Sequence, residues 1–200
     1  YNLLRVQQLG KDTLLTFGGP YSNHIYATAA AAKLFGFNSI GIIRGEEPKD
    51  KSYTLKFAAS QGMQLVYADR TTYRNKDDEN YLHQLQLQYP NAYIVPEGGT
   101  NQYALRGVAE LVQEIDVPFN YLCSACGTGG TLAGMVAGLK GEKQLIGFSS
   151  LKGDDALTGQ IDKLVQGYAG ESYKNYSVNF GYHFGGYAKV KPELTDFIKA

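Results

Sequence analysis

Strand-like and helix-like patterns alternate along the chain, and this alternation limits the folds that the chain can adopt. Short apolar runs typical of strands are followed by stretches whose apolar residues recur at helical spacing. The connections are short, and a crossover through a helix joins strands that run parallel. The sequence therefore predicts an α/β fold in which parallel sheets are flanked by helices.

The expected elements fall into two series, which we interpret as two lobes with a cleft between them. We expect a truncated N-terminal helix over residues 1–12, a smaller α/β domain over 13–90 and a larger one over 91–200. Strands are expected at Thr13–Phe17, Ser39–Arg44, Gln64–Ala68, Ala92–Val95, Phe119–Cys126, Gln144–Ser150 and Tyr176–Phe180. Helices are expected at residues 22–34, 51–60, 77–88, 103–115, 132–139, 155–165 and 194–200, and a loop at Tyr182–Tyr187.

Charge and composition exclude several classes of partner. Lys+Arg and Asp+Glu number 19 each, so no charge excess favours nucleic acid or an anionic membrane, and a small molecule is the expected partner. No apolar run approaches the roughly 20 residues that span a bilayer, and no signal peptide is visible, which favours a cytoplasmic protein. Cys123 and Cys126 lack further Cys or His ligands nearby, so we expect buried structural cysteines and no metal site.

A glycine-rich turn, Gly127-Thr128-Gly129-Gly130-Thr131, joins a predicted strand to a predicted helix. Glycine lacks the Cβ atom that would keep a ligand away from the backbone, and the threonines add hydroxyl donors. The first turn of a helix also offers unpaired N–H groups. Such a turn binds anions, most often phosphate, although a tight structural turn is the alternative.

Two common nucleotide-binding motifs do not fit this turn. A dinucleotide fold needs an acidic residue at the end of the next strand, but that strand ends in Ser149-Ser150-Leu151-Lys152. A P-loop needs Gly-Lys-Ser/Thr after its glycines, and none follows here. The turn is therefore predicted to hold a ligand with a single phosphate group.

Two more polar loops follow predicted strands, at Gly18–His24 and Glu97–Asn101. Ligands of α/β folds bind beyond the carboxyl ends of the strands, so we expect these loops and the glycine-rich turn to converge on one cleft. In the first loop, Ser22 or Asn23 has an alternative reading as a simple helix N-cap.

Three motifs occur in the order and spacing of one enzyme family: Gly18-Gly19-Pro20-Tyr21-Ser22-Asn23-His24, Pro96-Glu97-Gly98-Gly99-Thr100 and Gly127-Thr128-Gly129-Gly130-Thr131-Leu132-Ala133-Gly134-Met135. The chain resembles the 1-aminocyclopropane-1-carboxylate deaminase and D-cysteine desulfhydrase family across essentially its whole length. The resemblance implies a tryptophan-synthase β-like fold, the fold type II of pyridoxal-phosphate enzymes.

The resemblance also implies roles for individual residues. The cofactor's phosphate would be bound by Thr128, Gly129, Gly130 and Thr131. Asn23 would hydrogen-bond the phenolic oxygen of the pyridine ring, and Ser22 would contact the substrate carboxylate or help to move a proton. The substrate side of the ring would be lined by Gly98, Gly99 and Thr100, together with His24, whose orienting or packing role is favoured over a catalytic one.

By the same resemblance, the activity would be that of a pyridoxal 5'-phosphate-dependent deaminase or lyase. The substrate would be a small amino acid, 1-aminocyclopropane-1-carboxylate or D-cysteine, and the products ammonia and a 2-oxo acid. A cytoplasmic homodimer is expected. A non-catalytic module that binds a phosphorylated ligand or the cofactor is the alternative.

The family's Schiff-base lysine lies in a short Asn-Lys motif just before the helix that would contain Tyr1, and this sequence has no such motif. The contexts of Lys11, Lys33 and Lys152 do not match it. The first ten residues resemble a helix without its start signal. We therefore expect the sequence to be a fragment that lacks both ends of the enzyme, including the partner of the pyridine nitrogen.

Overall fold

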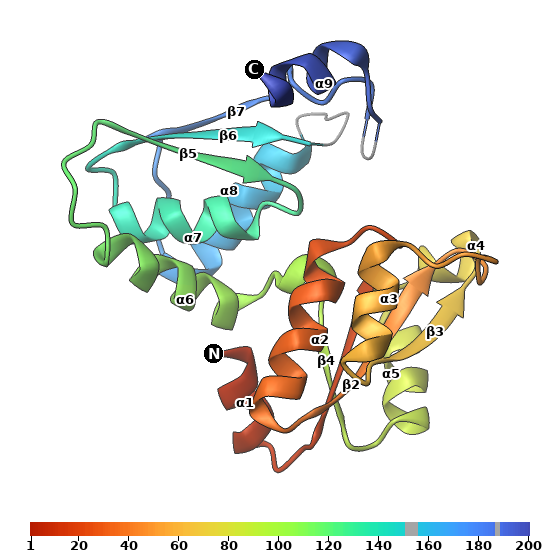
Figure 1. The fold of residues 1–200 in the computed structure, drawn as a ribbon. Helices are drawn as coiled ribbons and strands as arrows, with labels where there is room; N and C mark the ends of the chain where they lie inside the picture. Colours follow the sequence, from red (N-terminus) through yellow and green to blue (C-terminus); the bar gives the residue numbers. More distant parts are fainter. Residues whose placement is uncertain (151–155, 187–188) are drawn as a thin grey trace. The chain divides into compact units, whose positions relative to one another are not determined.

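Two parallel β-sheets, each with its own helices, divide the chain into the units Tyr1–Gly99 and Thr100–Ala200 (Figure 1). The computed structural model describes residues 1–150, 156–186 and 189–200. The strands are β1 (Thr13–Gly18), β2 (Asn38–Arg44), β3 (Gln64–Ala68), β4 (Ala92–Val95), β5 (Tyr121–Cys126), β6 (Gln144–Ser149) and β7 (Tyr176–Asn179). The helices are α1 (Asn2–Gln8), α2 (Asn23–Phe35), α3 (Tyr53–Ser60), α4 (Arg70–Tyr73), α5 (Glu79–Gln88), the 3-10 turn η1 (Glu97–Gly99), α6 (Gln102–Gln113), α7 (Gly130–Leu139), α8 (Ala156–Ala169) and α9 (Pro192–Lys199).

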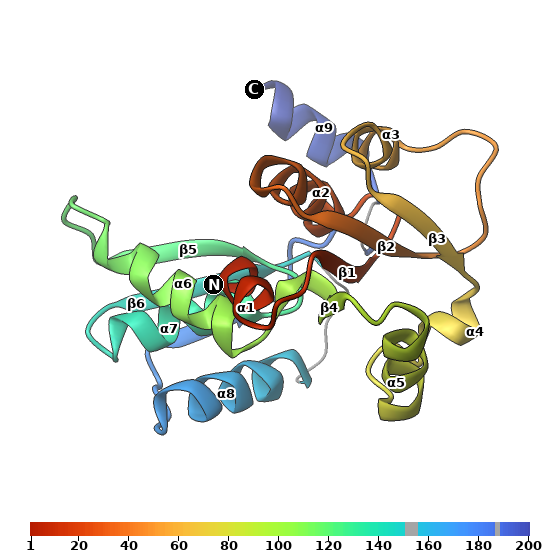
Figure 2. The same ribbon diagram turned by 90° about the horizontal axis from the view of Figure 1, so that it is seen from below.

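The first sheet has the strand order β3-β2-β1-β4, and every pair in it is parallel. Figure 2 shows α2 and α3 on one side of this sheet and α5 on the other. Leu15 and Phe17 of β1 pack in the core cluster that contains Leu85 of α5, whereas Leu14 packs with Val6 of α1. Burial on both faces is what a parallel sheet requires, and it explains why β1 is apolar at successive positions.

The strand Ala92–Val95 was expected to begin the second lobe, and this prediction is wrong. The strand pairs with β1, with Thr13 opposite Ala92 and Thr16 opposite Val95, and so completes the first sheet. The chain consequently divides after Gly99 and not near residue 90. The distinction between a smaller domain and a larger cofactor domain stays a prediction.

The second sheet has the order β5-β6-β7, again parallel throughout. In Figure 1, α6, α7 and α8 lie on one side of it. Helix α7 is the centre of this unit, because nine of its ten residues are buried. It packs against α6 through two glycines: a Cβ atom on Gly134 would lie 2.5 Å from the Cβ of Val108, and one on Gly138 would lie 2.8 Å from the carbonyl oxygen of Ala109.

The prediction that both cysteines of β5 are buried is wrong for Cys123. Cys126 is buried, whereas Tyr121 is 64% exposed and Cys123 is also exposed. Successive strand residues point to opposite faces, and within the described residues the packed helices cover only one face of β5. The expected burial therefore holds for Cys126 and fails for Cys123.

Side-chain caps set where several helices begin. Helix α3 begins at Tyr53, later than predicted, because Ser52 accepts a hydrogen bond from the amide of Leu55. Helix α5 begins after Asp78 for the same reason, and the short helix α4 was not predicted.

The predicted first residue of α8, Asp155, and the last residue of the predicted loop at Tyr182–Tyr187 lie outside the described residues. No helix among the described residues is long and apolar enough to span a membrane.

Candidate functional site

The loop Gly18–His24 makes a tight turn from β1 into α2. Ser22 is the N-cap of α2, and its Oγ accepts a hydrogen bond of 3.3 Å from the amide of Ile25. A Cβ atom on Gly18 would lie 2.5 Å from the Ile25 side chain and 2.8 Å from Ser22 Oγ, so only glycine fits there. The N-cap reading of Ser22 is thus correct. The cap uses Ser22 Oγ as an acceptor and leaves the hydroxyl hydrogen available for a ligand.

A second serine holds this loop from another element. The hydroxyl of Ser52 donates a hydrogen bond to the carbonyl oxygen of Pro20, while Oγ caps α3. Ser52 therefore ties the middle of the loop to the start of α3. Ser52 was not predicted as a site residue, because its only signal in the sequence is a serine directly before a helical stretch.

His24 links β1, β4 and α2 through the hydroxyl of Thr16. Thr16 Oγ1 donates to the carbonyl oxygen of Val95 at 2.8 Å and lies 2.7 Å from His24 Nε2. A hydroxyl has one hydrogen, so Nε2–H must donate to Thr16 and Nδ1 of the neutral ring carries the lone pair. The other edge of the ring lies against Gly99, where an added Cβ would be 3.2 Å from Cε1 and 3.4 Å from Nδ1.

Burial lowers the pKa of His24 from its ordinary 6.5 to about 4, because the charged ring would lose its hydration. The ring is therefore neutral at physiological pH. This arrangement fits the orienting role that was predicted for His24, since the ring holds the first loop beside the η1 turn.

The lowered pKa predicts how stability depends on pH. The unfolded chain protonates His24 as pH falls below about 6.5, whereas the folded chain does so only near pH 4. Stability should thus be lost as pH falls from 6.5 toward 4, by about 3 kcal/mol from this residue. We expect His24→Gln to lose much less over that interval. Denaturant titrations of both proteins at pH 7 and pH 4.5 measure the difference, and equal losses would show that His24 does not carry the effect.

Asn23 is exposed at the first position of α2, and no described residue forms a hydrogen bond with its side-chain amide. Its amide is thus available to a ligand at the start of α2, as the predicted contact with the pyridine ring requires. The neighbouring turn contains Gly98 and Gly99 with φ of 70° and 73°, a left-handed conformation that favours glycine. Ser22, Asn23, His24, Gly98 and Gly99 all lie at the carboxyl ends of the adjacent strands β1 and β4.

The second unit holds the glycine-rich turn between β5 and α7. Gly129 has φ of 84°, and a Cβ there would lie 2.8 Å from Ile161. A Cβ on Gly130 would lie 2.6 Å from Thr100 Oγ1, and that oxygen is itself 2.6 Å from Thr128 Oγ1. The two glycines therefore let the backbone of the turn pack closely against Ile161 and Thr100. The hydrogen bond between Thr100 and Thr128 holds the turn in this position.

The start of α7 has the properties of a phosphate site. It has no side-chain cap and no acidic residue in its first turn. The helical hydrogen bonds begin with the amide of Ala133, which donates to Gly129, so the amides of residues 130–132 precede the intrahelical pattern. The same turn contains two threonines, of which Thr131 is exposed and Thr128 is partly buried. The dipole of this buried helix favours an anion there, so one phosphate group fits the residues present.

The predicted site residues therefore form two groups. Ser22, Asn23, His24, Gly98 and Gly99 belong to the first unit, and Thr100 with residues 128–131 belongs to the second. Each group is assembled within its own unit, and their convergence on one cleft stays a prediction. No group of His, Cys, Asp and Glu suited to a metal ion occurs among the described residues.

Thr16 is a further residue that the sequence analysis missed, because a threonine inside an apolar strand looks like part of the core. Its signal was the combination of a polar strand residue with a histidine eight positions later. Lys11, which was not assigned to the Schiff base, donates to the carbonyl oxygen of Ala92 at 2.6 Å and so has a structural role.

Comparisons with known proteins show which proteins this chain resembles. The family model described as pyridoxal-phosphate dependent enzyme matches residues 1–181. A Pyrococcus abyssi protein provisionally named 1-aminocyclopropane-1-carboxylate deaminase is 29% identical over 96% of this chain and 62% of its own length. The mitochondrial bifunctional D-cysteine desulfhydrase/1-aminocyclopropane-1-carboxylate deaminase of Arabidopsis thaliana is 30% identical over 64% of this chain and 36% of its own length.

A solved structure shares the fold over the full chain. The crystal structure of a homologue of 1-aminocyclopropane-1-carboxylate deaminase superposes with a TM-score of 0.82 and 27% identity, and the match covers 100% of this chain and 64% of that one. The chain thus spans less than two thirds of the length of these proteins.

Proposed function

The chain belongs to the family of pyridoxal-phosphate dependent enzymes, and from this premise we propose that it is the cofactor-binding part of a deaminase or lyase acting on a small amino acid. Its fold is the predicted tryptophan-synthase β-like α/β fold of the fold type II enzymes. The proposed substrates are 1-aminocyclopropane-1-carboxylate and D-cysteine, in line with the names of the relatives. The reaction would release ammonia and a 2-oxo acid, and from D-cysteine also hydrogen sulfide.

The observation that carries this proposal is the uncapped start of α7 beside the Thr100–Thr128 pair. We propose that the phosphate of pyridoxal 5'-phosphate binds there, on Thr128, Gly129, Gly130 and Thr131. When bound, the cofactor would supply an electron sink for negative charge that develops on the substrate. The chain's own task is to anchor the phosphate and to orient the ring.

The residues of the first unit would act on the ring and the substrate. The exposed amide of Asn23 would donate to the phenolic oxygen of the ring, and the hydroxyl of Ser22 would contact the substrate carboxylate or carry a proton. The neutral His24 would hold Gly99 beside the substrate without adding charge. Because Nδ1 of His24 has the lone pair, it can accept but not donate a hydrogen bond.

The relatives are enzymes by name, so the alternative of a non-catalytic binding module receives no support from them. The expected homodimer and the cytoplasmic location remain predictions. The choice between cyclopropane-ring opening and D-cysteine desulfhydration also remains open, because the relatives carry both names.

The phosphate anchor can be tested with ligands that lack the reactive aldehyde and so cannot attach to surface lysines. We expect pyridoxine 5'-phosphate to bind at least about a hundredfold more tightly than pyridoxine, since charge-assisted hydrogen bonds at a helix start are strong. Isothermal titration calorimetry of the chain with each ligand measures the ratio. Equal affinities would refute a phosphate anchor and with it the proposed cofactor site.

A further inference from the structure

A pocket outside the predicted cofactor and substrate residues opens in the first unit beside α4. Its volume is about 540 Å³, and it is lined by Arg44, Arg70, Tyr73, Arg74, Lys76 and Glu97. These residues come from the end of β2, from α4 and the segment after it, and from η1. Four of the six lining side chains are cationic and one is a carboxylate, so the pocket has an excess of positive charge.

The carboxylate of Glu97 already interacts with two neighbouring groups. Glu97 accepts a hydrogen bond of 2.7 Å from the hydroxyl of the buried Tyr73, and its other oxygen lies 3.6 Å from Lys76 Nζ. Lys76 also pairs with Asp77 at 2.5 Å. Burial, followed by the hydrogen bond to Glu97, raises the pKa of Tyr73, so its hydroxyl remains a donor. With Asp77 counted, this network has one net negative charge, so the positive charge of the pocket comes from its arginines.

The three arginines differ from Lys76. Arg44, Arg70 and Arg74 are exposed, and no described carboxylate forms an ion pair with any of them. The guanidinium of Arg44 lies over the ring of Tyr73, 5.8 Å from its centre, and this stacking holds it at the pocket. Three guanidinium groups thus line one pocket without an anion to balance them within the described residues.

We propose that this pocket binds a small oxyanion with at least two negative charges, a phosphate ester or a polycarboxylate. Guanidinium groups are planar and bind phosphate and carboxylate oxygens in pairs, which makes arginine the usual residue for such ligands. A ligand with one negative charge would leave part of the positive charge of the pocket unbalanced.

The pocket also touches both loops that are proposed to meet the substrate. A Cβ atom on Gly19 would lie 3.3 Å from the Arg44 guanidinium, so Arg44 packs on the loop Gly18–His24. Glu97 directly precedes Gly98 and Gly99 in the other loop. An anion bound in the pocket would therefore lie beside residues that contact or belong to both loops. We expect it to stabilise both loops.

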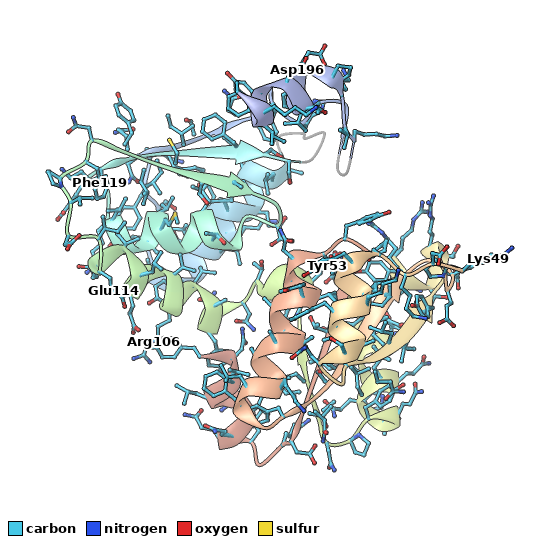
Figure 3. The ribbon with its side chains drawn as sticks, viewed as in Figure 1. Lys49, Tyr53, Arg106, Glu114, Phe119 and Asp196 are labelled. Atoms are coloured by element: carbon cyan, nitrogen blue, oxygen red, sulfur yellow. The ribbon has the colours of Figure 1, made fainter. Side chains whose placement is uncertain are left out.

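The test compares citrate and inorganic phosphate on the chain and on two charge-matched variants. Arg70→Gln/Arg74→Gln removes two pocket cations, whereas Arg106→Gln/Lys163→Gln removes two exposed cations in the other unit, where Arg106 lies on α6 (Figure 3). Calorimetry in chloride buffer of equal ionic strength should show at least about tenfold weaker citrate binding for the first variant only. Equal weakening in both variants would mean general charge attraction and would overturn the proposal.

The start of α7 is also a proposed phosphate site. The variant Gly130→Val distinguishes binding there from binding in the pocket beside α4. Citrate binding should persist in Gly130→Val and fall in the arginine variant, whereas the tightest site for pyridoxine 5'-phosphate should be lost in Gly130→Val and kept in the arginine variant. This experiment can therefore refute the proposed pocket site or the proposed site at the start of α7 independently of the other. Acetate serves as the monovalent probe: if its affinity equals that of citrate and falls in the same variant, the pocket binds one carboxylate and the proposal of a multivalent ligand is wrong.

Hydrogen exchange tests the link to the loops. Citrate should slow amide exchange in peptides covering residues 18–24 and 96–100 of the unaltered chain and not of the arginine variant. Circular dichroism without ligand controls for folding of the variant. Citrate that binds without slowing either loop would leave an anion site but refute its coupling to the substrate loops.

Discussion

Replacing Gly138 with valine should destabilise the second unit by about 3 kcal/mol or more. Valine places carbon atoms where α7 already touches the backbone of α6: the first added carbon would lie 2.8 Å from the Ala109 carbonyl oxygen and 2.9 Å from its Cα. Backbone atoms cannot rotate away as a side chain can, so the two helices must separate. That separation would open the core cluster around Leu105, Leu132 and Val136.

A glycine in the neighbouring helix provides the control with the opposite sign. Gly159 lies on α8, is exposed, and a Cβ added there meets nothing within 4 Å. Gly159→Ala should therefore stabilise the chain by up to about 1 kcal/mol through helix propensity alone. Denaturant unfolding followed by circular dichroism measures both variants. A Gly138→Val chain as stable as the unaltered one would show that α6 and α7 do not depend on this close contact.

Replacing Gly130 with valine should weaken the binding of pyridoxine 5'-phosphate about a hundredfold, the equivalent of one or two charge-assisted hydrogen bonds. A Cβ at this position would lie 2.6 Å from Thr100 Oγ1. The hydroxyl of Thr100 would have to move, and its contact with Thr128 at 2.6 Å would break. The first turn of α7 would then no longer present its amides and hydroxyls in one arrangement.

The same titration contains its own control for folding. Pyridoxine lacks the phosphate, so its weak binding should change little in Gly130→Val, and Gly159→Ala should bind both ligands as the unaltered chain does. Circular dichroism establishes that the variant remains folded. If Gly130→Val keeps full affinity for the phosphorylated ligand, the phosphate binds elsewhere and the assignment of residues 128–131 to the cofactor is wrong.

Local patterns were sufficient for much of the secondary structure and for the candidate phosphate site. The strand at Gln64–Ala68 has the predicted bounds, and Ser22 and Gly36 delimit α2 as a cap residue and a left-handed glycine usually do. The glycine-rich turn was identified because it depends on neighbours in the sequence: glycines, hydroxyls and the first amides of the following helix.

Contacts between residues far apart in the chain could not be predicted from such local patterns. Nothing local in Ala92–Val95 indicates that it pairs with β1, a strand almost eighty residues earlier. Cys123 looks as apolar as Cys126, and only the packing of the helices on one face of β5 separates an exposed thiol from a buried one. The arginines of the anion pocket showed a partial signal in Arg70 and Arg74, four residues apart, but Arg44 joins them only through the fold.

By itself, the sequence determined the α/β class, the order of strands and helices along the chain, and the uncapped glycine-rich start of α7. These follow from periodicity, capping and backbone freedom, which act over a few residues. Only the tertiary structure decided which strands are neighbours, that His24 donates to Thr16, that two glycines bring α7 onto α6, and that three arginines share one pocket. These features depend on distances between residues far apart in the chain, which are fixed only when the sheets and helices pack.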